Sequence, residues 1–564
     1  MVTLVRRRSW SRALRVETLV LAAVVALVAY AALVPLGYLV SRAFVEDGRP
    51  TLAGVLDALR ADDLATLVLN SLLFAAGSTL LAAALGTGLA FLVERTDLPL
   101  RRVVLVLALV PLIVPGILYT IAWIFLASPR SGALNVALEP VAGEGTLDVF
   151  GLGGMVVVEG LHLTPIVLLV MVAAFRSLDP AFEEAARLSA ARPWTVFSRV
   201  SLPLVRPALL VAGLVVLVRA LEAFEVPALL GIPGGTWVLT SRIWRALSFS
   251  PADYVEASVY SLLLLVLAAV GVYAHTRLSR GRRFQTVTGR GFRPPLVRLG
   301  RWRWPLAGVV GAYLAVAVAL PLLLLVYVST QPFYAAPSLD RLRLTTFANY
   351  ADVLGDPAAL RAARNSAVLA AGAATLVMLL TAVASWIVVR TRARGRWLVG
   401  GLAFVPLVMP GIVLGEALLF TYLRLPVPVY GTLWILLIAY VTRHLPYGIA
   451  SATASMHQVG SELEESARAS GARWWPTFRR VVLPLAAPGL LAGWLAIATL
   501  SLRELSSSIV VYSPGNEVLS IRIWEQYENG SFPELAALGV LIVVAVVPLV
   551  AAAYALGARA RPRV

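Results

Sequence analysis

The sequence predicts an all-α transmembrane protein of twelve helices, arranged as two tandem units of six spans. Hydrophobic residues make up 59% of the 564 residues and charged residues only 14%, whereas soluble proteins carry about 25% charged residues. Twelve apolar runs are long enough to cross a bilayer. The second half also repeats the first, since NSLLFAAG (from Asn70) matches NSAVLAAG (from Asn365) and VPLIVPG (from Val110) matches VPLVMPG (from Val405). Such spaced self-similarity indicates a duplicated unit.

We expect the first unit to occupy residues 19–276 and the second to occupy residues 304–557. The expected spans of the first unit lie at about 19–40, 65–93, 103–127, 153–176, 203–227 and 254–276. Those of the second lie at about 306–328, 363–389, 397–423, 431–456, 484–509 and 534–557. The third span of the first unit contains Pro111 and Pro115, and such prolines break the helical hydrogen-bond ladder.

Charge predicts the orientation. The segments assigned to the cytosol hold 32 of the 48 Arg residues but only 9 of the 31 acidic residues, as the positive-inside rule requires when both termini are cytosolic. These segments include the N-terminus (1–18), a linker between the units (277–303) and the C-terminus (558–564). The linker carries nine Arg and no acid. A nucleic-acid-binding arm is disfavoured, because no aromatic platform is interleaved and membrane spans flank it. The first apolar run lacks a signal-peptide cleavage site.

Composition excludes several kinds of chemistry. The chain has no Cys, and reading the sequence shows no Lys either, so all 48 basic residues are Arg. Disulfides and thiolate metal sites are therefore excluded, as is a P-loop ATPase within this chain. The four His show no metal-ligand spacing. We expect no catalytic residue, no metal site and no cofactor bound by this chain.

Two aligned segments carry the most specific signal. EEAARLSAARPWTVFSRVSLP (183–203) and EESARASGARWWPTFRRVVLP (464–484) match without a gap at an offset of 281 residues. They resemble the EAA loop of ABC importer permeases, whose pattern is E-A-A-x3-G-x9-I-x-L-P. Ala190 stands where that family has Gly, whereas Gly471 keeps it and can adopt a positive-φ turn at little cost.

The resemblance implies that each segment forms a coupling helix seated on a separate ATPase. Glu184 and Glu465 would face Arg or Lys of that partner. Two ATPase copies would bind ATP and Mg on the cytosolic side, and an extracytoplasmic solute-binding protein would deliver substrate. An ordinary solvated amphipathic helix is the alternative. The residues assigned to coupling are Glu184, Ala185, Ala186, Ala190 and Pro203 in the first copy, and Glu465, Ser466, Ala467, Gly471 and Pro484 in the second.

Ionisable residues inside the spans mark a candidate translocation path, because charge at membrane depth is costly. In the fifth span Arg219, Glu222 and Glu225 are spaced to lie along one stripe of a helix. Pairing between helices that only holds the bundle together is an equally open interpretation. The full candidate set is Glu159, His162, Arg219, Glu222, Glu225, Arg443, His444, Arg503 and Glu504.

Phrases such as EAFEVPALLG (222–231) and YVTRHLPYGI (440–449) resemble fused permeases of the ferric iron importer group. That resemblance implies a multi-pass protein of the plasma (inner) membrane. Related permeases for thiamine, polyamines, phosphonates and sulfate share the architecture, so these substrates stay open. An ion-driven secondary transporter with two six-span repeats is a rival, and a scaffold or receptor without transport is a third possibility.

Overall fold

A computed structural model describes residues 2–46, 49–189, 193–280, 296–391 and 395–559. The chain forms two compact structural units. From here on, the first and second units are these structural units, and the two sequence repeats are called the first and second halves. The first combines Met1–Gly54, Gly355–Arg522 and Val544–Val564, and the second combines Val55–Leu354 and Ile523–Val543. Each unit therefore draws on both halves of the sequence.

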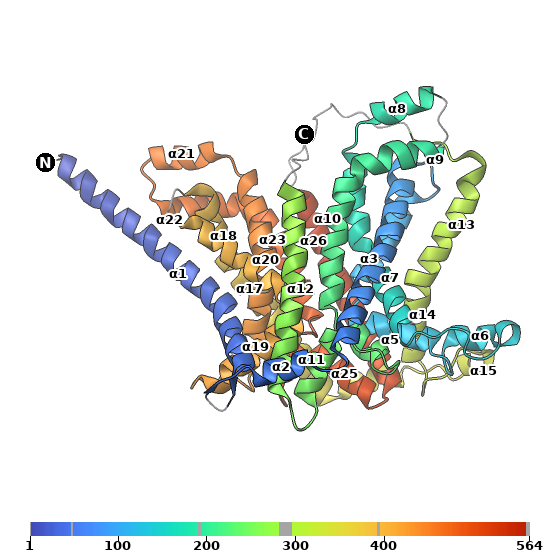
Figure 1. Ribbon diagram of the computed structural model, residues 1–564. Helices are drawn as coiled ribbons and strands as arrows, with labels where there is room; N and C mark the ends of the chain where they lie inside the picture. Colours follow the sequence, from blue (N-terminus) through green and yellow to red (C-terminus); the bar gives the residue numbers. More distant parts are fainter. Residues whose placement is uncertain (1, 47–48, 190–192, 281–295, 392–394, 560–564) are drawn as a thin grey trace. The chain divides into compact units, whose positions relative to one another are not determined.

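The described residues are mainly helical, and an antiparallel ladder of two-residue strands, β1 (Val45–Glu46) with β2 (Arg49–Pro50), accompanies the helices. The main helices of the first unit are α1 (Val2–Phe44), α17 (Pro357–Arg390), α18 (Arg396–Phe404), α19 (Gly411–Arg424), α20 (Leu433–Gln458), α21 (Ser461–Ala469), α22 (Trp474–Thr477), α23 (Leu483–Leu502) and α24 (Ser508–Val511) (Figure 1). Those of the second unit are α3 (Leu64–Arg95), α4 (Arg101–Ala108), α5 (Gly116–Ala127), α6 (Ala133–Ala142), α7 (Leu152–Arg176), α8 (Pro180–Leu188), α9 (Pro193–Val196), α10 (Leu202–Glu222), α11 (Leu239–Ser248), α12 (Tyr254–Arg280), α13 (Arg303–Leu314), α14 (Leu320–Ser329), α15 (Leu339–Leu342) and α16 (Ala348–Gly355). Among the described helices, α2 (Ala53–Leu59), α25 (Leu519–Glu528) and α26 (Phe532–Arg559) lie across the unit boundaries, and the last residue of α16, Gly355, belongs to the first unit.

Among the described residues, ten helices are long and apolar enough to cross a membrane. Two further spans are bent pairs, α4 with α5 at 100° and α18 with α19 at 105°. The expected twelve spans are therefore present if each bent pair counts as one span. The break that the prolines predicted within 103–127 is present, and the matching segment 397–423 also turns sharply in its middle.

The bends follow from the two Val-Pro-containing repeats. Each segment tightens into a 3₁₀ turn, Val110–Leu112 or Val405–Val408, and then reaches a proline that precedes the next helix. Pro115 has ψ of 137° and Pro410 has ψ of 148°, so both residues are extended. A proline also has no N–H to donate and disfavours α-helix in the residue before it. The chain therefore restarts its helix at Gly116 and at Gly411 in a new direction.

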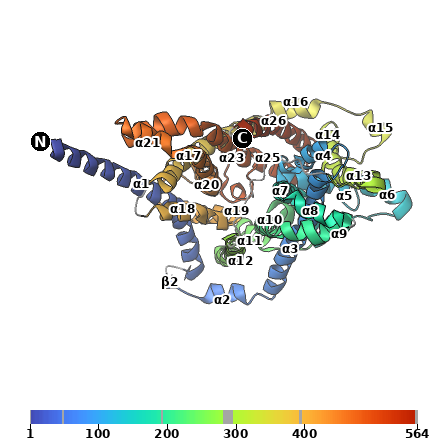
Figure 2. The ribbon, with the colours of Figure 1, turned by 90° about the horizontal axis from the view of Figure 1, so that it is seen from above.

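The core of the first unit is built by α17, α18, α20 and α23, and α1 packs onto it. Val24 and Val28 of α1 are buried in the same cluster as Val377 and Leu445. The Tyr30 hydroxyl lies 3.0 Å from that of Tyr422 on α19. The first span of the chain thus packs against spans from the second half of the sequence (Figure 2).

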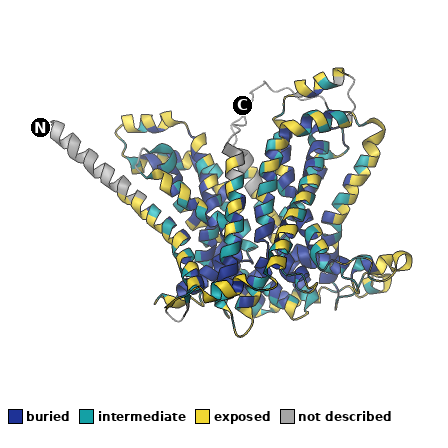
Figure 3. Ribbon diagram, in the orientation of Figure 1, coloured by how far each residue is buried: buried dark blue, intermediate teal, exposed yellow. Residues whose placement is uncertain are grey.

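The second unit shows the reciprocal arrangement. Its core lies between α3, α4, α7 and α10, and Val310 of α13 is buried in it. The Tyr119 hydroxyl on α5 donates a 2.9 Å hydrogen bond to the carbonyl of Ala317, which precedes α14. Figure 3 shows the division between the buried and exposed faces of α3 and α13. The first span of each half therefore packs in the unit built mainly from the other half.

Candidate coupling surface and transport path

Each EAA segment folds as a short helix, a break and a second helical stretch that enters a span. In the second unit α8 leads through α9 and a π-helical turn (Phe197–Ser201) into α10. In the first unit α21 leads through α22 and a π-helical turn (Phe478–Val482) into α23. Pro203 and Pro484 are the second residues of α10 and α23, directly after the π-helical turns. Gly471 has φ of +84°, whereas Ala190 lies outside the described residues.

The predicted coupling carboxylates lie on the surface. Glu184 and Glu465 are exposed, and Ala185 and Ser466 are exposed beside them, with Ala186 and Ala467 half-buried. Within the described part of the chain neither carboxylate forms an ion pair or a side-chain hydrogen bond. Large apolar side chains flank the first of them, since Phe182 is 55% exposed and Leu188 is 90% exposed. The outer face of α8 is thus an apolar surface with one unpaired acid.

The carboxylates that directly precede these two, Glu183 and Glu464, are buried instead of exposed. The sequence alone did not single them out. Glu183 is buried and lies 3.5 Å from Arg95 at the end of α3. Glu464 is buried and lies 3.1 Å from Arg390 at the end of α17. The Ser201 hydroxyl donates a further 2.7 Å hydrogen bond to Glu183. Each short helix is therefore tied to the second span of its own half by an ion pair.

The signal for these pairs was present in the repeat. Arg95 and Arg390 align at an offset of 295 residues, and Glu183 and Glu464 align at 281. The first residue of a Glu-Glu pair cannot be distinguished from the second by composition, because burial depends on which face of the helix meets the bundle.

The charged residues of the first unit converge at the bend between α18 and α19, which is the third span of the second half. Arg443 of α20 lies 3.2 Å from Glu504 and donates a 3.2 Å hydrogen bond to the carbonyl of Met409, just before the bend at Pro410. Glu504 also accepts bonds from the amide (3.1 Å) and the hydroxyl (3.0 Å) of Ser507. A buried carbonyl freed by a helix break needs such a donor.

Two further candidates of this unit lie nearby. The His444 ring lies 3.4 Å from the Ser501 hydroxyl, and Arg503 is half-buried at the end of α23. A Cβ on Gly411 would lie 2.7 Å from Ser506 and 3.2 Å from the Arg443 guanidinium carbon. Only glycine therefore allows the bend to approach this charge cluster.

The second unit repeats the arrangement with different side chains. Gly116, the counterpart of Gly411, faces His162 and Glu225, whose nearest atoms would lie 3.5 and 3.7 Å from an added Cβ. The His162 ring stacks on Tyr119 with centroids 5.1 Å apart. Glu159 is buried on α7 and lies within electrostatic range of Glu225 and Arg219. The bend of the third span is thus a polar centre in both units.

The expected stripe of Arg219, Glu222 and Glu225 is corrected. Helix α10 ends at Glu222, and Ala223 is extended with ψ of 133°, so Glu225 lies beyond the helix. Pro227 causes the break, because its ring would clash with the carbonyl four residues earlier, that of Ala223. The hydroxyl of Thr240 donates a 2.8 Å hydrogen bond to this carbonyl. Glu222 is buried at the helix end.

Equivalent residues of the two halves meet within the second unit. Trp244 and Trp524 occupy matching positions of the SRIW and IRIW repeats. Their rings lie edge to face with centroids 5.5 Å apart, and Phe224 contacts Trp524 at 5.7 Å. Aromatic packing of this kind adds about 0.5–1.5 kcal/mol beyond area burial. The two repeats therefore touch each other through matching side chains at this point.

Comparison with known proteins identifies the family. The profile of the binding-protein-dependent transport system inner membrane component matches residues 78–284 and again residues 377–564. The ferric transport system permease protein FbpB of Actinobacillus pleuropneumoniae is 25% identical over 472 residues, covering 82% of this chain and 67% of that protein. FbpB 1 of Haemophilus influenzae, which carries a provisional assignment to ferric transport, is 26% identical over 444 residues and covers 77% and 68% of the two chains.

Shorter relatives match one half. The spermidine/putrescine transport system permease protein PotC of Escherichia coli is 32% identical over 198 residues, covering 35% of this chain and 73% of PotC. A bacterial ABC transporter involved in alginate import is similar to 50% of this chain at 19% identity, with a TM-score of 0.42. Because the family profile matches both repeats and most of the chain, the protein belongs to the binding-protein-dependent inner membrane permeases of ABC importers.

Proposed function

We propose that this chain is the fused permease of a ferric iron importer and works with two separate ATPase subunits and an external solute-binding protein. The observation that carries the proposal is the match of both halves, over 77% and 82% of the chain, to proteins assigned to ferric transport. Ferric iron would be the transported substrate. Its passage would need only transient contacts along a path, not a resident metal site.

The proposed ATPase-coupling surface is inferred from which carboxylates of α8 and α21 are buried and which are exposed. Glu183 and Glu464 hold α8 and α21 against the spans, which leaves Glu184 and Glu465 exposed. An exposed apolar face such as that around Phe182 and Leu188 is typical of a partner-binding surface. The partner ATPases would bind ATP and Mg and contribute the cationic partners of these carboxylates.

The transport path would run past the polar centres at Gly116 and Gly411. Buried charges next to a break in a span are typical of substrate and ion pathways. Arg443 with Glu504 supplies charge of both signs at Gly411, and Glu225 lies with His162 at Gly116. From the distribution of basic segments we infer that both termini lie in the cytosol, on the inner side of the membrane.

Uptake of radioactive ferric iron under iron limitation tests the proposal. Cells that lack the chain should lose ATP-dependent uptake, and the intact chain should restore it. The double variant E184R/E465R should insert normally but fail to restore uptake or retain the ATPase during purification. A matched control is E139R/E144R, which reverses two exposed acids in the loop segment between the third and fourth spans.

Each rival has its own outcome. Iron uptake independent of the chain, together with chain-dependent uptake of spermidine, would favour a polyamine permease, which the 32% identity of PotC makes the second candidate. Thiamine, phosphonate and sulfate would be tested in the same way. Transport that survives ATP depletion but not loss of the proton gradient would favour a secondary transporter. An absence of both flux and ATPase binding would favour a scaffold.

A further inference from the structure

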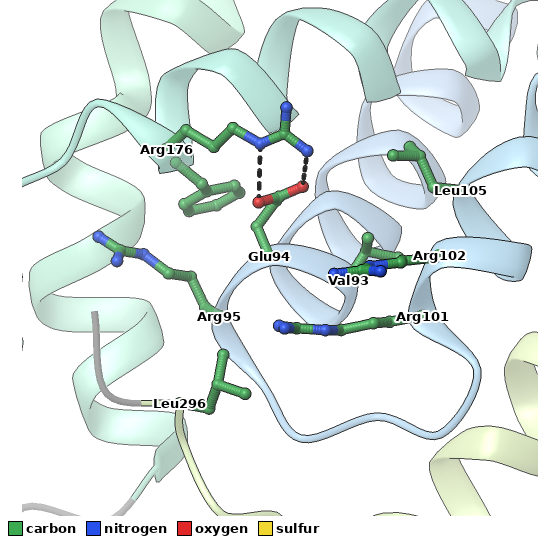
Figure 4. A pocket seen from close by; sticks show the side chains of 9 residues that line it. Val93, Glu94, Arg95, Arg101, Arg102, Leu105, Arg176 and Leu296 are labelled. Atoms are coloured by element: carbon green, nitrogen blue, oxygen red, sulfur yellow. Dashed lines mark hydrogen bonds and ion pairs between the residues drawn. The ribbon is translucent and has the colours of Figure 1, made fainter. Parts of the chain in front are cut away.

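A pocket of about 500 Å³ lies in the second unit where α3 and α7 end and α4 begins (Figure 4). Four arginines line it, Arg95, Arg101, Arg102 and Arg176, against a single acid, Glu94. Leu105 and Phe175 give it an apolar wall. The pocket is therefore strongly cationic and has an apolar side.

Two of the four arginines are already engaged. Arg176 donates two hydrogen bonds, of 2.9 and 2.7 Å, to the two oxygens of Glu94. Arg95 pairs with Glu183 and donates a 2.9 Å hydrogen bond to the carbonyl of Leu178. These contacts neutralise two of the four positive charges.

The other two have no counter-ion. Arg101 is half-buried and Arg102 is exposed, and neither forms an ion pair or a side-chain hydrogen bond with any residue that the structure describes. In Figure 4 both side chains extend toward the side of the pocket where Glu94 and Arg95 lie. They are the first two residues of α4, whose N-terminal amides add positive partial charge.

The pocket is held in shape from two sides. Leu100 adopts a positive φ of 52° to start α4. The end of the linker is bonded to the same turn, because the Val297 amide donates to the carbonyl of Arg95 at 2.8 Å and the Leu299 amide donates to Asp97 at 2.9 Å. The cationic groups are therefore positioned before any ligand arrives.

The residues of the second half that align with this pocket differ from those that line it. Arg396 occupies the position of Arg101, but its guanidinium donates a 2.5 Å hydrogen bond to the carbonyl of Thr391. Trp397 stands in place of Arg102, and Val389 and His457 stand in place of Glu94 and Arg176. At the aligned positions that the structure describes, the second half therefore does not repeat this pair of unpaired arginines.

We propose that this pocket binds the phosphate group of an anionic ligand, supplied either by a phospholipid headgroup or by free phosphate. Arginine binds phosphate through paired N–H groups, and basic pockets between spans on the cytosolic side bind anionic headgroups. Val103 and Val106 of α4 are exposed next to the pocket, so acyl chains could lie along them. The assignment to the cytosolic leaflet depends on the proposed orientation, whereas the binding itself does not.

Native mass spectrometry of the whole chain with phosphatidylglycerol and phosphatidylcholine tests the site. The wild type should retain phosphatidylglycerol preferentially. In the variant R101Q/R102Q the preference should fall roughly thirtyfold, because each arginine contributes about fivefold. The variant R101K/R102K should keep most of the preference. The matched control R396Q should behave as the wild type. No preference in the wild type, or an unchanged preference in R101Q/R102Q, would overturn the proposal.

Equilibrium dialysis with radioactive inorganic phosphate separates the two sources. Phosphate that binds the wild type, competes with phosphatidylglycerol and is lost in R101Q/R102Q assigns the pocket to free phosphate. Retention of phosphatidylglycerol without competition by phosphate assigns it to the lipid headgroup. Thermal unfolding of R101Q/R102Q should match that of the wild type, because neither arginine holds another element in place.

Discussion

Glu183 on α8 lies 3.5 Å from Arg95 at the end of α3, with each side chain only 2% exposed. Its neighbour Glu184 is exposed. Two adjacent carboxylates therefore have separate roles, one that holds the short helix to the bundle and one that is available to a partner. The same division occurs between Glu464 and Glu465.

Removing the buried carboxylate should loosen α8. In E183Q the charge of Arg95 stays buried without its counter-ion, which costs about 3–5 kcal/mol when a buried pair loses one member. We expect faster hydrogen exchange across 181–188 and a lower unfolding temperature. E184Q is the matched control, and equal effects of the two substitutions would contradict the division of roles.

Gly411 should be essential to the bend of the third span. An added Cβ would lie 2.7 Å from Ser506, so G411A should lower the unfolding temperature and reduce transport. G400A is the control, because nothing lies within 4 Å of a Cβ there and alanine favours helix over glycine by up to about 1 kcal/mol. A G411A protein as stable and active as G400A would show that the close approach is unimportant.

Arg443 should not be replaceable by lysine. Its guanidinium reaches both Glu504 and the carbonyl of Met409, and a single ammonium on a flexible four-carbon stem cannot reproduce this fork. We expect R443K to lose most transport and R443Q to lose stability as well, because it strands the Glu504 charge. Thermal unfolding and uptake assays would be run beside R424Q, which alters an exposed arginine at the end of α19. Full activity of R443K would refute the requirement for two simultaneous bonds.

Asp356 should make stability depend on pH. Burial alone would raise the pKa of Asp356, but hydrogen bonds from the Ala358 amide and from Arg522, with the charge of Arg522, outweigh burial and lower the pKa below its ordinary value. The folded pKa is thus below the unfolded one, near 3.9. The stabilisation is fully present above the unfolded pKa and is lost as pH falls through the folded pKa.

The variant D356N isolates this charge, because asparagine still caps the helix that begins at Pro357. The difference in unfolding temperature between the wild type and D356N should be largest at neutral pH and should shrink on acidification below about pH 4. D352N, at an exposed position of α16, should show no such trend. A difference that stays constant from pH 7 to pH 3 would contradict the role of the Asp356–Arg522 pair.

The amino-acid sequence by itself determined the twelve apolar segments, the duplication and the place of the two EAA segments. Each of these three features depends on composition or on matches along the chain, and none of them requires knowledge of which residues are in contact. The prolines of the third spans also marked a break, although the bends of 100° and 105° required the positions of the neighbouring helices.

Only the tertiary structure decided which charges are buried and which are exposed. Glu183 pairs with a residue 88 positions earlier, and its burial depends on which face of α8 meets α3. The end of α10 at Glu222 depends on Pro227 together with Thr240, which bonds the carbonyl that the break leaves free. The packing of α1 on α18 and α19 likewise joins residues several hundred positions apart. A local pattern carries no information about such contacts, because their free energy arises only when both partners are in place.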